Sequence, residues 1–420
     1  METAKTDSII PMLANTHAAS AALRKLSDQQ RAAILFDLAD RLKKNEGFIL
    51  TENQKDLNNM EMGNPKMDRL LLNKKRIEEL AQSLINVANL PDPTNKILLE
   101  KTLPNGLHLQ KKSVALGVVG VIYEARPNVT IDVSALCLKS GNGVVLKGGS
   151  DAHFTNQALL YIVHESLQNA GLSKDTICLL PAGREYVKEM LEATRYIDII
   201  IPRGSETLIK YVRQNSLVPT IETGAGVCHT YVHKDADLDK AAKIVVNAKT
   251  TRVSVCNSLD TIIVDRSIAK AFLPKIFNDF IHFNVEIFAD EESFDILKEL
   301  NYPYLELARE DDFGREFLSF KCSLKIVGNI DEALNHIDKY SSRHSEAIVS
   351  ENETMCEKFI DEVDAAAVYS NASTRFTDGG EFGLGAEIGI STQKLHARGP
   401  FALEKLVTEK WIVVGDGQIR

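Results

Sequence analysis

The chain has 420 residues, more than one hydrophobic core usually serves, so we expect two domains and a small appendage. Its 44% hydrophobic and 25% charged residues are typical of a folded globular protein. The 49 Lys and Arg against 58 Asp and Glu give a formal net charge of −9, which argues against a nucleic-acid partner because such a partner needs a basic surface.

The first 90 residues have the apolar spacing of helices, and a hairpin follows them. Ser27 precedes one such helical run and is expected to cap it. The segment Pro-Asp-Pro at 91–93 ends the helical part. Alternating segments at 97–103 and 107–113 flank the turn Pro-Asn-Gly at 104–106, which strongly predicts a β-hairpin. A polar hairpin so far from any core often pairs with another subunit.

From residue 114 onward, short apolar strands alternate with helices. This order is typical of a parallel, doubly wound sheet. Ligands bind such sheets beyond the carboxyl ends of the strands, which places residues 147–151 and 203–206 on the binding edge. The strands predicted here span residues 114–123, 143–147, 176–180 and 197–201.

A second βα run starts near Thr230, so we place a domain boundary at residues 225–232. A Gly-rich segment at 379–399 and an apolar strand at 411–414 complete the chain. The elements predicted in the second run are helices at 237–248 and 268–283 and strands at 259–264, 325–327, 346–349 and 366–369.

Neither a membrane span nor a targeting segment is predicted. No apolar stretch approaches the about 18 residues that cross a bilayer. The N-terminus, with Glu2, Lys5 and Asp7, lacks the apolar core of a signal peptide. We therefore expect a cytoplasmic protein with no membrane partner.

The six cysteines are scattered, without a CxxC pair or a Cys/His metal spacing. We expect a reducing compartment, no disulfides and no metal site. His229 and His233 are four residues apart, but a metal needs more partners, so we interpret them as ordinary strand-end residues. The cysteines are Cys137, Cys178, Cys228, Cys256, Cys322 and Cys356.

Cys256 falls between a predicted helix and a predicted strand of the second run, and therefore in a loop. Loops on a rigid scaffold often carry reacting groups, and a thiol is strongly nucleophilic once deprotonated. Arg252, close in sequence, would lower its pKa. The alternative is a small buried hydrophobic residue, which we expect of the other five cysteines.

Two segments at predicted strand ends carry residue types suited to binding. The glycines after Lys147 would let a cofactor approach the backbone, and the following helix N-terminus favours an anion. The segment is not GxGxxG, and a tight turn with a surface lysine is the alternative. Arg126 suits a carboxylate or phosphate, and Asn128 suits a developing oxyanion, although a polar turn explains both.

The glycine-rich segment at 378–392 is too long and polar for a bare turn. It carries Phe382, Leu384 and Ile388, which linkers rarely do. We expect a lid or a pocket wall there.

Four segments in this order resemble the γ-glutamyl phosphate reductase branch of the aldehyde dehydrogenase superfamily: YEARPNVT at 123–130, LKGGSDA at 146–152, VCNSLDT at 255–261 and GGEFGLGAEIGISTQKLHARGP at 379–400. The resemblance implies an α/β, aldehyde-dehydrogenase-like fold of two doubly wound βα domains plus a small β oligomerisation element, and hence a homo-oligomer. It implies an NADP-binding domain at 1–96 and 114–228 with part of 376–395 near it, a catalytic cysteine domain at 229–375, and an oligomerisation element at 97–113 and 396–420.

The resemblance also implies roles for individual residues. Cys256 would be the nucleophile and Lys147 would meet the adenosine ribose, in the segment that continues with Gly148, Gly149 and Ser150. Gly204 and Ser205 would lie near the pyrophosphate. NAD-preferring relatives usually have an acidic residue where this chain has Ser150, so the cofactor NADPH/NADP+ is favoured.

Glu222 lies 34 residues before Cys256, as does the general base of hydrolytic aldehyde dehydrogenases. A reductase would be harmed by an activated water. We therefore favour a structural or substrate-amine role for Glu222, with the general base as the alternative.

The implied reaction is NADPH-dependent reduction of L-γ-glutamyl 5-phosphate to L-glutamate 5-semialdehyde and phosphate, the second step of proline biosynthesis from glutamate, through a thioester on Cys256. Asn128 and the Cys256 backbone N–H would stabilise the oxyanions. Phosphate or the α-carboxylate would bind Arg126 or Arg252, and the α-amine would bind Glu124 or Glu222. We also consider glutamate 5-kinase as a partner for substrate transfer.

Two other functions are weighed against this one. An aldehyde dehydrogenase that oxidises another semialdehyde would act without phosphate and would use Glu222 as its base. A non-catalytic binding protein of the same fold would be marked by loss of the cysteine or the cofactor lysine, and both Cys256 and Lys147 are present.

Overall fold

The protein is described by a computed structural model that covers residues 8–61, 67–124 and 126–420. Glu2, Lys5 and Asp7, on which the expectation about the N-terminus depends, lie outside these residues. Two compact units make up the chain. Unit 1 comprises Met1–Thr223, Gly383–Gly389 and Phe401–Arg420, and unit 2 comprises Gly224–Phe382 and Ile390–Pro400. The chain first passes from unit 1 to unit 2 between Thr223 and Gly224, just before the domain boundary expected at 225–232.

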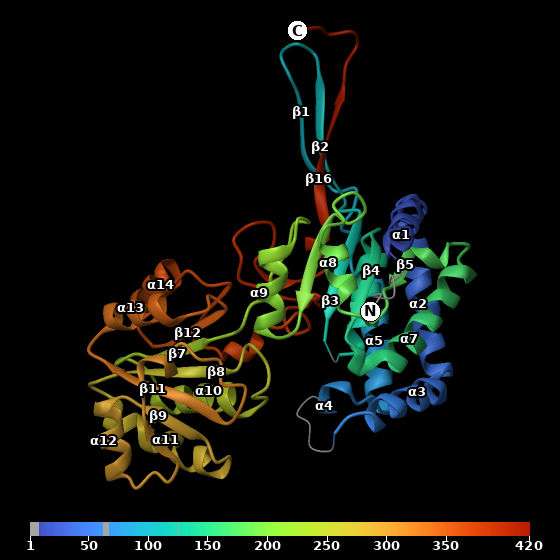
Figure 1. The fold of residues 1–420 in the computed structure, drawn as a ribbon. Coiled ribbons are helices and arrows are strands. Elements are labelled where there is room, and N and C mark those ends of the chain that lie inside the picture. The colour runs from blue at the N-terminus through green and yellow to red at the C-terminus, as the bar shows by residue number, and fades with distance from the viewer. Residues whose placement is uncertain (1–7, 62–66, 125) are drawn as a thin grey trace. The chain divides into compact units, whose positions relative to one another are not determined.

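Helices open unit 1, and the second of them begins where its predicted cap stands. Ser27 caps the second helix: its hydroxyl accepts a hydrogen bond from the Gln30 N–H (3.3 Å), and the Gln30 side chain accepts one from the Ser27 N–H (2.8 Å). This reciprocal capping box confirms the predicted start. The helices are α1 (Ile10–Leu23), α2 (Asp28–Lys44), α3 (Glu46–Asn58), α4 (Met67–Leu70) and α5 (Lys74–Asn89) (Figure 1).

A four-stranded parallel sheet forms the centre of unit 1, in the order β5-β4-β3-β6. Its two inner strands are fully buried, as a parallel sheet covered on both faces requires. The strands are β3 (Val118–Tyr123), β4 (Gly143–Gly148), β5 (Ile177–Leu179) and β6 (Ile199–Arg203), and the intervening helices are α6 (Asn128–Lys139), α7 (His153–Asn169), α8 (Glu185–Leu191) and α9 (Glu206–Asn215).

The single strand predicted over 114–123 is wrong, because Gly117 interrupts it. Gly117 has a φ of +134°, and a Cβ there would lie 2.0 Å from Asp198 Oδ2. The Asp198 carboxylate accepts a hydrogen bond from the Val118 N–H (2.7 Å). The backbone therefore turns at this glycine, and two separate strands result.

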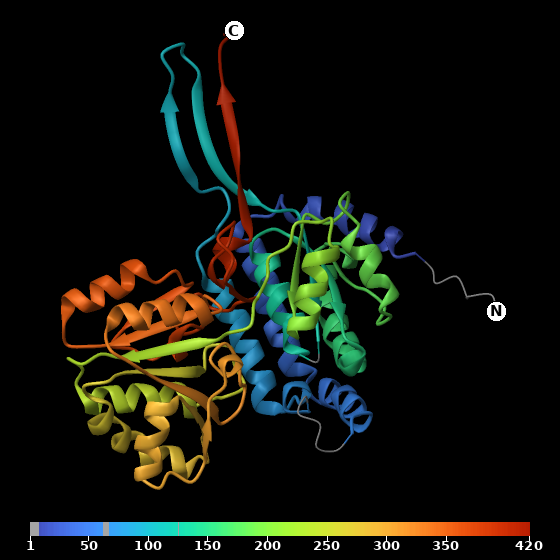
Figure 2. The same cartoon turned by 60° about the vertical axis from the view of Figure 1, so that its left-hand side comes forward.

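The predicted hairpin is confirmed, and the C-terminal strand joins it. β1 (Ile97–Thr102), β2 (His108–Ala115) and β16 (Val407–Val414) form an antiparallel sheet in the order β1-β2-β16. Figures 1 and 2 show these strands extending away from the rest of unit 1. All six residues of β1 are exposed, and so is Trp411.

Unit 2 is built on a seven-stranded sheet in the order β10-β9-β11-β8-β7-β12-β13, in which every described pairing is parallel. One face packs against α10, α11 and α12, and the other against α13 and α14 (Figure 1). The strands are β7 (Cys228–Val232), β8 (Leu259–Asp265), β9 (Glu286–Ala289), β10 (Leu305–Leu307), β11 (Lys321–Val327), β12 (Ser345–Val349) and β13 (Ala367–Ser370). The helices are α10 (Leu238–Thr250), α11 (Ala269–His282), α12 (Glu291–Glu299), α13 (Ile330–Tyr340) and α14 (Glu353–Glu362).

The glycine-rich segment is partly packed. β14 (Gly389–Ser391) and β15 (Gly399–Phe401) form a two-stranded sheet. Ile388 and Ile390 are buried, whereas Phe382 is exposed. Within residues 8–61, 67–124 and 126–420, no helix combines the length and apolar character that a membrane crossing needs.

Candidate active site

Cys256 lies in unit 2, in the loop between α10 and β8. All six cysteines are among the described residues, and Cys256 alone is partly exposed while the other five are buried. Burial raises the pKa of Cys178 to about 11 and that of Cys322 to about 12, and it also raises the pKa of Cys137 and Cys228. Because the thiolate is the reactive form, Cys256 is the cysteine best placed to act as a nucleophile.

The backbone of Cys256 is fixed from the start of β7. The Cys228 thiol donates a hydrogen bond to the Cys256 carbonyl oxygen (3.2 Å). Gly226 packs so closely that a Cβ on it would lie 1.7 Å from the same oxygen. Only a glycine allows this approach, and the position of Cys256 therefore depends on a residue 30 positions earlier in the chain.

Asn257, next to the cysteine, is held by the segment after β13. Its amide nitrogen donates to the carbonyl oxygens of Arg375 (3.2 Å) and Thr377 (2.9 Å). Its amide oxygen accepts a hydrogen bond from Arg375 Nη1. The Thr374 hydroxyl donates to the Asn257 carbonyl oxygen (2.8 Å). These contacts tie the cysteine loop to residues 374–377, which no sequence motif predicted.

A buried lysine and a buried aspartate stand at the two ends of this loop. Lys249 Nζ donates to the Leu259 carbonyl oxygen (2.6 Å) and lies 3.9 Å from Asp260 Oδ1. Asp260 Oδ1 also accepts from the Phe317 N–H (3.0 Å). Burial raises the pKa of Asp260 to about 7 and lowers the pKa of Lys249. The pair lies where the loop joins α10 and β8. Within the loop, Arg252 is exposed.

Lys147, the candidate cofactor residue, is buried at the carboxyl end of β4 in unit 1. Its ammonium donates to the carbonyl oxygens of Gly148 (3.1 Å) and Ala182 (3.0 Å). Burial lowers its pKa, and the exposed Glu185 partly offsets this. The lysine is therefore not a surface residue of a plain turn.

The residues after Lys147 lead into α7. A Cβ on Gly148 would lie 2.5 Å from the Asn156 amide nitrogen. Gly149 precedes a short 3-10 turn at Ser150–Ala152, and Ser150 is exposed. The segment thus presents a hydroxyl, with no carboxylate at that position.

Glu124 contacts Gly204 and Ser205, the residues that the family resemblance predicts to lie near the pyrophosphate. The backbone N–H and the hydroxyl of Ser205 donate to its carboxylate at 3.0 and 3.3 Å. Ser205 caps α9, so a negative charge stands at that helix N-terminus, as the helix dipole favours. A Cβ on Gly204 would lie 2.8 Å from the Glu124 carboxylate. The structure therefore brings Glu124, Gly204 and Ser205 together.

The other candidates also lie in unit 1. Asn128 begins α6, and its amide donates to Asp132 Oδ2 (3.0 Å), which uses one of the two N–H groups of that amide. Arg126 is half-buried in the preceding turn. Glu222 forms an ion pair with Arg213 (3.5 Å). Among the candidates, only Cys256 and Arg252 belong to unit 2.

Replacing Asp132 with asparagine is expected to change the pH dependence of unfolding. Burial raises the pKa of Asp132 from 3.8 to about 6, although hydrogen bonds from Asn128 and Ser83 oppose the rise. Between these two pKa values the folded state therefore binds more protons at Asp132 than the unfolded state does. The stability that the protonated side chain contributes is lost as pH rises through about 6. The unfolding free energy of D132N relative to wild type should rise by on the order of 2 kcal/mol between pH 4 and 7.

Urea unfolding followed by circular dichroism at several pH values measures this difference. Asp151, which lies in the same unit on a half-exposed turn, provides the matched D151N control. Parallel pH profiles for wild type and D132N would contradict the assignment.

The interpretation of the two histidines holds for His233 and is wrong for His229. His233 follows β7 and its Nδ1 lies 2.9 Å from the Ser350 hydroxyl. His229 lies inside β7 and is fully buried, with Nδ1 2.9 Å from Glu346 Oε2. Sequence spacing could not reveal a partner 117 residues away. Nowhere in the described parts of the chain do His, Cys, Asp or Glu side chains gather as a metal would require.

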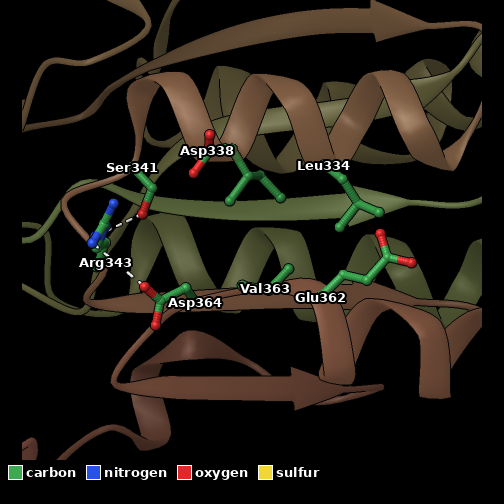
Figure 3. A pocket seen from close by; sticks show the side chains of 8 residues that line it. Leu334, Asp338, Ser341, Arg343, Glu362, Val363 and Asp364 are labelled. Atoms are coloured by element: carbon green, nitrogen blue, oxygen red, sulfur yellow. Dashed lines mark hydrogen bonds and ion pairs between the residues drawn. The ribbon is translucent and has the colours of Figure 1, made fainter. Parts of the chain in front are cut away.

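The small pocket in Figure 3 is not a substrate site. Its accessible volume of about 30 Å³ suits one or two water molecules. Arg343 extends toward Asp364 there (3.4 Å), and Asp364 also pairs with Lys394 and Arg398, both at 2.7 Å. The hydrogen bonds from Lys394 and then from Arg398 lower the pKa of Asp364 to about 2. These ion pairs link residues 390–400 to the rest of unit 2.

Comparison with known proteins identifies the family of the chain. The sequence model of the aldehyde dehydrogenase family matches residues 1–294. Gamma-glutamyl phosphate reductase of Legionella pneumophila (strain Paris) is 52% identical over 400 residues, 95% of each chain. The protein of that name in Chlorobium chlorochromatii (strain CaD3) is 52% identical over 416 residues, 99% of each chain. The crystal structure of gamma-glutamyl phosphate reductase from Thermotoga maritima superimposes with a TM-score of 0.93 at 39% identity, covering 99% of this chain and 100% of that one.

Proposed function

Since the chain belongs to the aldehyde dehydrogenase family and, within it, to the γ-glutamyl phosphate reductases, we propose that it performs its reaction through a thioester on Cys256. The activity is reduction of γ-glutamyl phosphate to glutamate 5-semialdehyde in proline biosynthesis, with a nicotinamide cofactor. The observation that carries the proposal is the partial exposure of Cys256 in a loop that is held by hydrogen bonds at Cys256 itself and at Asn257.

In the proposed mechanism, the Cys256 thiolate attacks the acyl carbon of the substrate. The new S–C bond forms as the C–O bond to the phosphoryl group breaks, and inorganic phosphate leaves with the electron pair. NADPH, when bound, supplies the hydride that reduces the thioester. The Cys256 backbone N–H and the Asn128 amide are the proposed donors to the oxyanions, and each such donor is worth about 10²–10³ in rate.

We propose NADPH as the cofactor because of the residues at the end of β4. The ammonium of Lys147 and the exposed hydroxyl of Ser150 fit a 2′-phosphate, which a carboxylate at position 150 would repel. A pyrophosphate at the N-terminus of α9 would have to displace the Glu124 carboxylate from the Ser205 N–H. We therefore assign Glu124 to this cofactor-side position in preference to the substrate amine.

Replacing Lys147 with methionine is expected to lower kcat/KM for NADPH by about 10- to 100-fold, because a charge-assisted hydrogen bond to phosphate is lost. The value for NADH should fall much less. Steady-state kinetics with both cofactors checks this, and Lys188→Met, at an exposed position of α8, is the matched control. Equal losses for the two cofactors would assign Lys147 a purely structural role.

The experiment that tests the function is NADP+ reduction with glutamate 5-semialdehyde, measured with and without inorganic phosphate. Strict dependence on phosphate is expected, because phosphate must release the acyl group from the cysteine in this direction. Oxidation without phosphate would instead favour a hydrolytic aldehyde dehydrogenase with Glu222 as its base. Against that alternative, we assign Glu222 a structural role in its ion pair with Arg213.

We also propose that copies of the chain assemble through β1, β2 and β16. β1 and β16 are the outer strands of their sheet, and outer strands offer unpaired backbone groups. Ile97, Leu98, Val413 and Val414 are exposed on them. We propose a cytoplasmic location because none of the six cysteines, all of them described, forms a disulfide. We propose transfer of the acyl phosphate from glutamate 5-kinase only because that substrate is unstable.

A further inference from the structure

Arg375 contacts Asn257, the neighbour of Cys256, although no sequence pattern singled it out. It belongs to the short turn Thr374–Phe376 after β13, and its Nη1 donates to the side chain of Asn257, the neighbour of Cys256. Its Nε is buried and makes no hydrogen bond within the described residues. The guanidinium therefore has donor capacity that its protein contacts leave unused.

The charges around Arg375 favour an anion. Burial and then the Arg252 guanidinium lower the pKa of Arg375, while Asp378, Cys256 and Cys228 raise it. Arg252 belongs to the same loop as Cys256, so a second guanidinium accompanies Arg375 there, with the exposed Asp378 as a partial counter-charge. A bound dianion would relieve the repulsion between the two arginines.

The substrate carries two anionic groups, and the phosphoryl group suits this position better. It is joined through one oxygen to the acyl carbon that the thiol attacks, so it must lie next to Cys256 during the reaction. The α-carboxylate is separated from that carbon by the rest of the glutamyl side chain. Phosphate also carries nearly two charges at neutral pH, which matches a pair of arginines.

Building on the proposed function, we propose that Arg375, together with Arg252, binds the phosphoryl group of the acyl phosphate and the departing phosphate. In the forward direction this pair stabilises the charge that develops on the leaving oxygen as the C–O bond breaks. In the reverse direction the pair binds inorganic phosphate ready to attack the thioester.

The test measures KM for inorganic phosphate during NADP+ reduction with glutamate 5-semialdehyde. For R375Q this KM should rise by about 10- to 100-fold, since a charged hydrogen-bonding partner is lost. R375K, which keeps the charge without the planar fork, should show an intermediate value. KM for the semialdehyde should stay near that of wild type. The control is R266Q, because Arg266 follows the far end of β8 in an exposed pair with Glu292.

A second measurement separates binding from a merely structural role of Arg375. Inorganic phosphate should protect Cys256 from alkylation by iodoacetamide, and the half-protecting concentration should rise in R375Q by the same factor as KM. A loosened loop would change the unprotected alkylation rate and kcat, but it would leave the half-protecting concentration unchanged.

Unchanged phosphate KM and unchanged protection in R375Q would overturn the proposal. A rise in semialdehyde KM alone would also overturn it, because Arg375 would then hold the α-carboxylate. If the wild-type chain reduced NADP+ without any need for phosphate, the proposed function itself would fail. The protection assay would still decide whether Arg375 binds phosphate.

Discussion

Replacing Cys256 with alanine is expected to abolish phosphate-dependent NADP+ reduction, with a loss on the order of 10⁴-fold or more. Without the thiol no thioester forms, and no other side chain in the described loop can take its place as a nucleophile of comparable strength. The dissociation constant for NADPH, measured by fluorescence titration, should stay close to that of wild type because the cofactor candidates belong to unit 1.

Cys356→Ala is the matched control for this variant, since Cys356 is a buried cysteine of unit 2 in α14. It should lose some stability and keep its activity. If C256A retained substantial turnover, or if C356A lost activity without unfolding, the assignment of the nucleophile would be refuted.

The second large effect is expected for Gly226→Ala. The added methyl group would lie 1.7 Å from the Cys256 carbonyl oxygen. This oxygen belongs to the backbone, so the cysteine loop must shift. A displacement of about 1 Å at the reacting atom can cost on the order of 10²-fold in rate, and the strain should destabilise the fold by about 1–3 kcal/mol.

Turnover, the alkylation rate of Cys256 and urea unfolding together measure the effect of G226A. The control is Gly314→Ala, also in unit 2, where the nearest atom to an added Cβ is at 3.6 Å. Wild-type rates in G226A would show that the loop accommodates the methyl group and that the close approach does not position the cysteine.

Local signals in the sequence predicted much of the fold. Ser27 and Gln30 form a capping box within four residues of each other, and the turn at 104–106 joins two strands that pair directly. Such contacts are visible in a sequence because both partners lie in the same short stretch. β9, α12, β10, α13 and α14 were not predicted, although Asp290, Asn329 and Asn352 cap the three helices through local hydrogen bonds.

Of the candidate site, the sequence predicted the nucleophile, Cys256, but not the residues that hold its loop in place. Cys256 stood out because it falls between two regular elements. Its supporting residues could not be found this way, because Asn257 meets Arg375 across 118 positions and the Cys256 backbone meets Gly226 through bare backbone. A glycine beside a predicted strand, or an arginine in a polar turn, has the same appearance whether or not it supports a reactive loop.

The division of the chain has a consequence for its synthesis. Unit 1 begins with the first helices, yet it also contains Phe401 and Leu406, both fully buried, and the Leu406 carbonyl oxygen accepts a hydrogen bond from the Asn142 amide (2.8 Å). These partners emerge from the ribosome only after the whole of unit 2. Unit 1 must therefore remain incomplete in the nascent chain while unit 2 is synthesised. Unit 1 is the first to be translated and the last to be completed.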